Sequence, residues 1–188
     1  MRVNRQFWLP LLTMLLPWSS LVADHCPDET IAPGNPDMVL AGINMSTAHI
    51  EDVIARYGPP SARNHEPVEG GPPGSGSADY AWQIGRATLT ASTEFYRDES
   101  GKKIESVLVL RVHGPESSGR LQTGRGVGLG DPVAKVKSVY GSTYLDRTIN
   151  APRPSGTKVV YCYSDETELV FGIEQGRVST IVLFISEE

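Results

Sequence analysis

The chain contains one short segment twice, and this repetition constrains its fold more than any other feature. The segment Ile43–Gly58 has a counterpart at Val127–Gly141, and the matching positions are 83 residues apart. Both copies carry apolar residues at helical spacing and end in Tyr-Gly. Glycine suits a helix end, because it adopts backbone conformations that a Cβ disfavours. The pattern predicts two short helices, one in each half of the chain.

The residues before each predicted helix are typical of helix starts. Asp131 is placed to cap the second helix, and Pro132 suits its first position. In the first half, Ser46 or Thr47 takes the capping role. These residues predict where each helix begins.

Three strand-like runs follow each predicted helix. They cover about 80–84, 87–96 and 103–112 in the first half, and about 158–163, 167–173 and 177–185 in the second. Short connections such as Gly85-Arg86 suit antiparallel hairpins. The sequence therefore predicts an α+β fold of two tandem repeats, each a helix plus a three-stranded antiparallel meander, with the helices packed on one sheet face.

Changes in composition divide the chain into five predicted segments. These are a signal peptide at 1–23, an N-terminal tail at 24–36, a first α-β-β-β repeat at 37–112, a linker at 113–119 and a second α-β-β-β repeat at 120–188. Within the first repeat, residues 58–79 are rich in Pro, Gly and Ser, so a flexible loop is expected there.

The first 23 residues have the pattern of an export signal. Arg2 and Arg5 precede a nearly apolar stretch at 7–18, which is short for a bilayer span of about 20 residues. Ala23, a small residue, precedes Asp24 at the expected cleavage point. We expect a periplasmic or secreted protein with no membrane span after cleavage; an uncleaved membrane anchor is the alternative.

The net charge of the chain argues against one class of binding partner, the nucleic acids. Cleavage after residue 23 leaves 15 basic and 22 acidic residues, a net charge of −7. An acidic chain is poorly suited to nucleic acid, whose phosphates attract clustered Lys and Arg. No nucleic-acid partner is therefore expected.

The chain has two cysteines, Cys26 and Cys162. In an oxidising compartment two cysteines most often pair with each other. Their disulfide would close a loop of 136 residues and contribute about 4–5 kcal/mol in the chain-entropy model. A catalytic thiol is the rival interpretation.

The repeated motif resembles a known module. A Gly-Val/Ile-x-Leu/Ile-Gly-Asp-x-x-x-x-Val-x-x-x-Tyr-Gly pattern followed by three strands resembles the α/β modules of the SmpA/OmlA lipoprotein type. Two such modules in tandem are similar in plan to the β-lactamase inhibitor protein. The resemblance covers about 37–186 and implies a non-enzymatic module that binds other proteins, without assigning any binding residue. The chain departs from it in lacking a lipobox and in having one candidate disulfide between tail and second repeat.

Strand alternation assigns side chains to two faces of the predicted sheets. In the first repeat, one face of the run at 87–96 carries Thr88, Thr90, Ser92, Glu94 and Tyr96. One face of the last strand in each repeat, about 104–110 and 178–184, is more apolar than a solvated surface. Either the two sheets join or pack there, or a partner binds there, flanked by Tyr96 and acidic residues. The candidate partner-face residues are Tyr96, Leu108, Leu110, Val182 and Phe184.

The sequence shows no catalytic or metal-binding signature. The glycine-rich stretch Gly124–Gly130 lacks the Gly-Lys-Ser/Thr ending of a phosphate loop, and the four histidines have no ligand spacing. We therefore expect no catalytic residues, no metal and no cofactor. The predicted function is an exported, non-enzymatic module for protein binding or envelope assembly. The alternative is a small secreted hydrolase with an unrecognised site.

Overall fold

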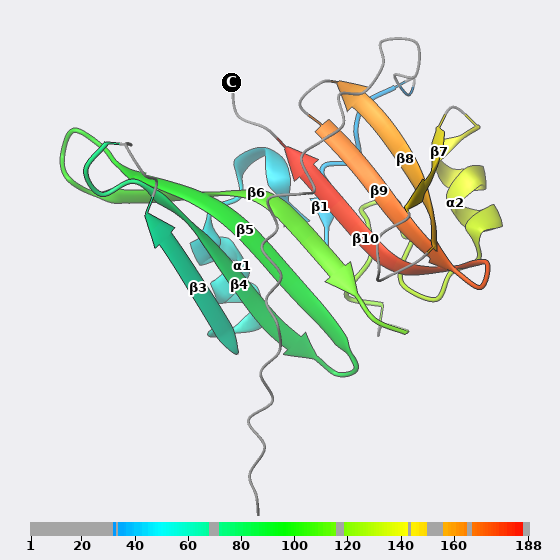
Figure 1. Cartoon of the computed structure of the whole chain (residues 1–188), viewed down its shortest axis with the longest axis horizontal. Helices are drawn as coiled ribbons and strands as arrows, with labels where there is room; N and C mark the ends of the chain where they lie inside the picture. Colours follow the sequence, from blue (N-terminus) through cyan, green and yellow to red (C-terminus); the bar gives the residue numbers. More distant parts are fainter. Residues whose placement is uncertain are drawn as a thin grey trace, which may run out of the picture.

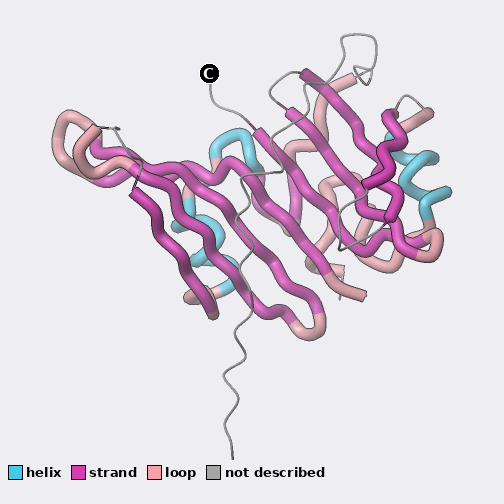
Figure 2. Tube along the Cα trace, in the orientation of Figure 1, coloured by secondary structure: helices cyan, strands magenta, loops and turns pink. Residues whose placement is uncertain are grey.

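The computed structural model describes residues 32, 34–67, 72–115, 119–142, 144–149, 156–164 and 167–185. The predicted signal peptide and Cys26 lie outside the described residues. The described part is mostly β-structure with two short α-helices (Figure 2). No helix within these ranges is both long and apolar enough to cross a membrane.

Eight antiparallel strands form one continuous sheet in the order β3-β4-β5-β6-β10-β9-β8-β7 (Figure 1). The strands are β3 (Ala62–Pro67), β4 (Gly76–Ile84), β5 (Ala87–Arg97), β6 (Lys103–His113), β7 (Leu145–Ile149), β8 (Gly156–Ser164), β9 (Thr167–Glu174) and β10 (Arg177–Ile185). The remaining elements are a two-stranded sheet of β1 (Val39–Leu40) and β2 (Ile43–Asn44), a short 3-10 helix, η3 (Met45–Thr47), and the helices α1 (Ile50–Tyr57) and α2 (Val133–Tyr140).

The predicted α+β class of two helix-plus-three-strand repeats is wrong. Four strands follow each helix, and all eight belong to a single sheet rather than to two separate ones. Helix makes up only a small part of the described chain, so the protein is mostly β.

The two strands that the sequence did not indicate, β3 and β7, lie at the edges of the sheet. Strand β3 falls inside the predicted flexible loop and is largely exposed and polar. Its backbone pairs with β4 from Ala62 opposite Ala81 to Pro67 opposite Gly76. A neighbouring strand therefore supplies the hydrogen bonds, and neither alternation nor β-propensity reveals such an edge strand.

The two predicted helices are confirmed, and their first residues are also 83 positions apart. Gly58 and Gly141 end them with φ of 79° and 92°, and their N–H groups donate to the helix at 2.8 and 2.9 Å. The predicted caps are wrong. His49 and Pro132 precede the helices, and Asp131 instead accepts from the backbone N–H of Gly128 at 2.8 Å.

The two halves of the chain meet at the pair β6–β10. This pair, called the seam, runs antiparallel from His113 opposite Thr180 to Val109 opposite Phe184. The ring nitrogen Nδ1 of His113 also lies 2.8 Å from Thr180 Oγ1 across it. The sequence left open whether two sheets join or pack at these strands. They join edge to edge, so one sheet results.

Both helices contribute to one hydrophobic core on one face of this sheet, called the inner face (Figure 1). Val53 of α1 is fully buried there. On α2, the Tyr140 ring lies 5.4 Å from Phe171 and 5.3 Å from Tyr161, both inner residues of the sheet. The opposite side of the sheet, called the outer face, has no described helix against it.

A β-bulge in β6 changes which side chains face the core. Ser92 pairs with Val109, but the next residue, Thr93, pairs with Val107, so Leu108 is an extra residue. The alternation reverses at this point, because one inserted residue exchanges the two faces. Val107 and Leu110 therefore both lie on the inner face, with 3% and 0% of their surfaces exposed.

A carboxylate is buried beneath the first half of the sheet. Glu105 Oε1 accepts hydrogen bonds from the hydroxyls of Tyr80 at 2.6 Å and Thr93 at 2.7 Å, and Lys103 Nζ pairs with Oε2 at 2.5 Å. Burial alone would raise the pKa of Glu105, but these three donors outweigh it and hold the pKa below its usual value. Burial and the carboxylate raise the pKa of Tyr80, so its hydroxyl stays a donor.

A second buried carboxylate connects the N-terminal segment to the second half. Asp37 Oδ2 accepts from Tyr140 OH at 2.7 Å and from the backbone N–H of Arg125 at 2.8 Å. The Tyr140 hydroxyl also lies 2.6 Å from Thr123 Oγ1. The segment that precedes α1 is therefore fixed to α2, and the two halves share one core.

We predict that Glu105→Gln lowers the free energy of unfolding at pH 7 by about 1–3 kcal/mol, because Tyr80, Thr93 and Lys103 lose the buried charged acceptor to which they donate. The folded pKa of Glu105 is depressed, so its ionisation stabilises the fold above the unfolded pKa of about 4.3. This stabilisation is lost as the pH falls through the folded pKa. Urea unfolding of both proteins between pH 3 and 7 should show their difference shrinking at low pH. A difference independent of pH would contradict the buried ion pair.

The predicted Cys26–Cys162 disulfide remains a prediction, because Cys26 lies outside the described residues. Cys162 is fully buried on β8, and the N–H of Ala32 donates to its carbonyl at 2.5 Å. A residue six positions after Cys26 therefore lies beside Cys162. Alkylation of the denatured protein, prepared from an oxidising compartment, should label no cysteine before reduction and two afterwards. Labelling of both thiols without reduction would refute the bond.

Candidate protein-binding face

The outer face is built from alternate residues of neighbouring strands. On β5 these are Thr88, Thr90, Ser92, Glu94 and Tyr96, as strand alternation predicted. The strand register aligns these residues in rows that cross β5, β6, β10 and β9. One row consists of Thr90, Arg111, Val182 and Val170. The next row consists of Ser92, Val109, Phe184 and Glu168. The face therefore runs without a break through both halves of the chain.

The structure brings three of the five predicted partner-face residues to the outer face. Tyr96 is 48% exposed, and Val182 and Phe184 are half-buried beside the seam. Leu108 is the half-buried bulge residue. Leu110 was assigned to the wrong face, because the bulge turns it into the core.

The sequence pattern did not indicate Val109 and Arg111, which take the outer positions that simple alternation gave to Leu108 and Leu110. Burial lowers the pKa of the Arg111 guanidinium from its usual value. No signal in the run Val107-Leu108-Val109-Leu110 marks the bulge, since all four residues are apolar and none is Gly or Pro.

The outer face has two zones of different chemistry. Over β4 and β5 it is polar, and Ser92 Oγ donates to Asp79 Oδ1 at 2.6 Å. Over β6, β10 and β9 it is mostly apolar, with half-buried Val109, Phe184 and Val170 beside the half-buried Arg111. An apolar patch beside polar residues is the usual arrangement of a protein interface.

Further along, at β8, the outer face is closed to solvent. Val160 and Cys162 are 2% and 0% exposed and form a small cluster of their own with Val170. Glu168 of β9, opposite Cys162, is also buried. The accessible part of the face is therefore the region of β4, β5, β6 and β10.

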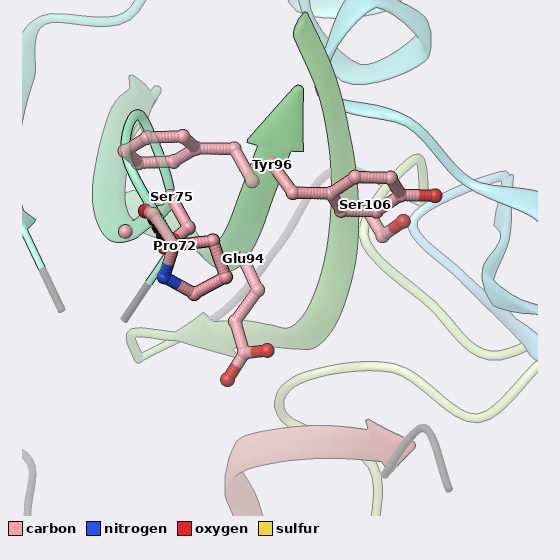
Figure 3. A pocket seen from close by; sticks show the side chains of 7 residues that line it. Pro72, Ser75, Glu94, Tyr96 and Ser106 are labelled. Carbon is pink, nitrogen blue, oxygen red and sulfur yellow. Dashed lines mark hydrogen bonds between the residues drawn. The ribbon is translucent and has the colours of Figure 1, made fainter. Parts of the chain in front are cut away.

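A shallow pocket of about 280 Å³ lies where the turn before β4 meets the ends of β5 and β6. Figure 3 shows Pro72 and Ser75 on one side of it, with Glu94 and Tyr96 from β5 and Ser106 from β6. The turn is closed by the Ser75 backbone N–H, which donates to the carbonyl of Pro72 at 3.0 Å. This site, called the Tyr96 pocket, lies at one end of the outer face.

The described residues contain little that could perform catalysis at this face. His113 and Thr180 are the closest to a base–nucleophile pair, but Thr180 is buried in the seam and lies outside the pocket lining. Within the described ranges, no three His, Cys, Asp or Glu residues are grouped to hold a metal ion.

Comparison of the chain with protein-family models, with curated proteins and with solved structures found no match. The resemblance to modules of the SmpA/OmlA type therefore remains a prediction.

We predict that Leu110→Asp lowers the free energy of unfolding by more than about 4 kcal/mol, because it places an unpaired charge in the core. Phe184→Asp should cost about 1–2 kcal/mol, since the half-buried carboxylate can reach water at the outer face. Denaturant unfolding of the two variants and the native chain measures both effects. Equal losses, or a larger loss for Phe184→Asp, would contradict the bulge at Leu108.

Proposed function

We propose that the chain is an exported protein-binding module that acts through the outer face of its sheet. The observation that carries this proposal is the position of Tyr96. Among the described residues it is the one large apolar side chain that stands well exposed, and it lies at a pocket on the helix-free face. Tyrosine is enriched in protein interfaces because its ring buries area while its hydroxyl remains hydrogen-bonded.

The layout of the face supports a protein partner over a small substrate. The pocket is shallow, whereas the apolar zone beside it extends over several strands. Small-molecule sites usually bury most of their ligand in a deep cavity. A broad face with one exposed aromatic residue at its polar end fits an extended macromolecular contact.

The single sheet also favours binding without rearrangement. The seam joins the halves by a continuous antiparallel ladder, and the inner face is fixed by one core. A surface held rigid before binding loses little conformational entropy when a partner arrives. No observation in the described residues favours the alternative function of a secreted hydrolase.

We predict that a double variant, Tyr96→Ala with Val182→Asp, weakens the binding of the native partner at least about tenfold, because it removes an aromatic contact and charges the apolar zone. The measurement is affinity capture from an envelope extract of the producing cells, followed by titration of the captured protein. The partner is accepted only if the native chain binds it in a stoichiometric complex.

The matched control is Ala55→Asp on α1, an exposed position on the helix side of the sheet. It adds the same charge away from the outer face and should bind as the native chain does. Equal binding by the double variant, or equal loss in both variants, would contradict a role for the outer face.

A further inference from the structure

The Tyr96 pocket combines an aromatic ring and a carboxylate. Glu94 and Tyr96 are two positions apart on β5 and therefore project from the same face. Opposite them on β6 lie Ser106, which pairs with Glu94, and Ile104, which pairs with Tyr96. In Figure 3 the Tyr96 ring extends across Ser106, whereas Glu94 extends to the other side.

Glu94 has no cation paired with it among the described residues. The two basic residues nearest to it along the β5–β6 hairpin are already engaged. Lys103 pairs with Glu105 at 2.5 Å and lies 4.0 Å from the centre of the Phe95 ring. Arg97 Nη1 donates to the carbonyl of Gly101 at 2.8 Å. Glu94 is exposed and lines the pocket.

We propose that the Tyr96 pocket receives an arginine side chain from the protein partner; this deepens the proposed function and rests on it. The guanidinium plane stacks on the Tyr96 ring, where the negative face of the aromatic system attracts a cation. Its N–H groups donate to the Glu94 carboxylate and the Ser106 hydroxyl. Pro72 offers an apolar surface to the aliphatic stem.

The overall charge of the chain agrees with a basic group on the partner. The exported form carries a net charge of −7 after cleavage at residue 23. A negative chain attracts positively charged partners at long range and repels acidic ones. A carboxylate beside an exposed ring then fixes the basic side chain at short range.

The proposal is tested by NMR titration of the exported chain with N-acetyl-arginine methylamide and, separately, with the neutral citrulline counterpart. The arginine probe should shift the backbone amide signals of Ser75, Tyr96 and Ser106 in a saturable manner. The citrulline probe should bind at least about fivefold more weakly than the arginine probe, because it lacks the cation. No saturable shift with arginine, or equal shifts with both probes, would overturn the proposal.

Variants locate the effect. Glu94→Gln and Tyr96→Leu should each weaken binding of the arginine probe several-fold, whereas Tyr96→Phe keeps the ring and should bind nearly as well. Glu174→Gln removes an exposed acid from β9, away from the pocket, and should have no effect. Dispersed amide spectra of all four confirm folding. Unchanged affinity in Glu94→Gln and Tyr96→Leu would refute the site.

This test separates the two proposals. If the outer face binds a protein but the arginine probe does not bind, the arginine site is wrong and the protein-binding function stands. If the arginine probe binds and the outer-face variant keeps its protein partner, the partner surface lies elsewhere and the outer-face function fails.

Discussion

The antiparallel pairing of β6 with β10 is the interaction on which the rest of the structure depends. Each half of the chain ends in one of these strands, so pairing them converts two four-stranded units into one eight-stranded sheet. It places both helices over a shared core and leaves the opposite side as one continuous face. Without this pairing both strands would be unprotected edges, which attract unspecific partners.

Polar contacts in the core stabilise the first half and connect the N-terminal segment to the second half. Glu105 collects three donors beneath the first half, and Asp37 connects the N-terminal segment to Tyr140 of α2. Buried carboxylates are tolerated only when hydrogen bonds replace the lost water. These contacts hold the inner face in one arrangement, and neither described helix covers the outer face.

Part of the fold and of the candidate site could be predicted from local sequence patterns. Glycine at positions 58 and 141 revealed the helix ends, and alternation along β5 assigned Glu94 and Tyr96 to the same side. The edge strand β3 could not be predicted, because its polar residues owe their strand conformation to the backbone of β4. The sequence also could not predict that Val109 faces outward and Leu110 faces the core, because a bulge among apolar residues depends on the strand with which they pair. Sequence alternation identified the exposed part of the site, and tertiary pairing determined the rest.

The most direct test of a single sheet with one helix-free face is the cross-strand NOE pattern of the chain. Contacts between the backbone protons of β6 and β10 should follow the register in which Arg111 lies opposite Val182 and Val109 opposite Phe184. Amide protons on both sides of the seam should exchange with solvent at similarly slow rates. If these NOEs are absent and the two strands exchange rapidly, the halves are separate units and the continuous outer face does not exist.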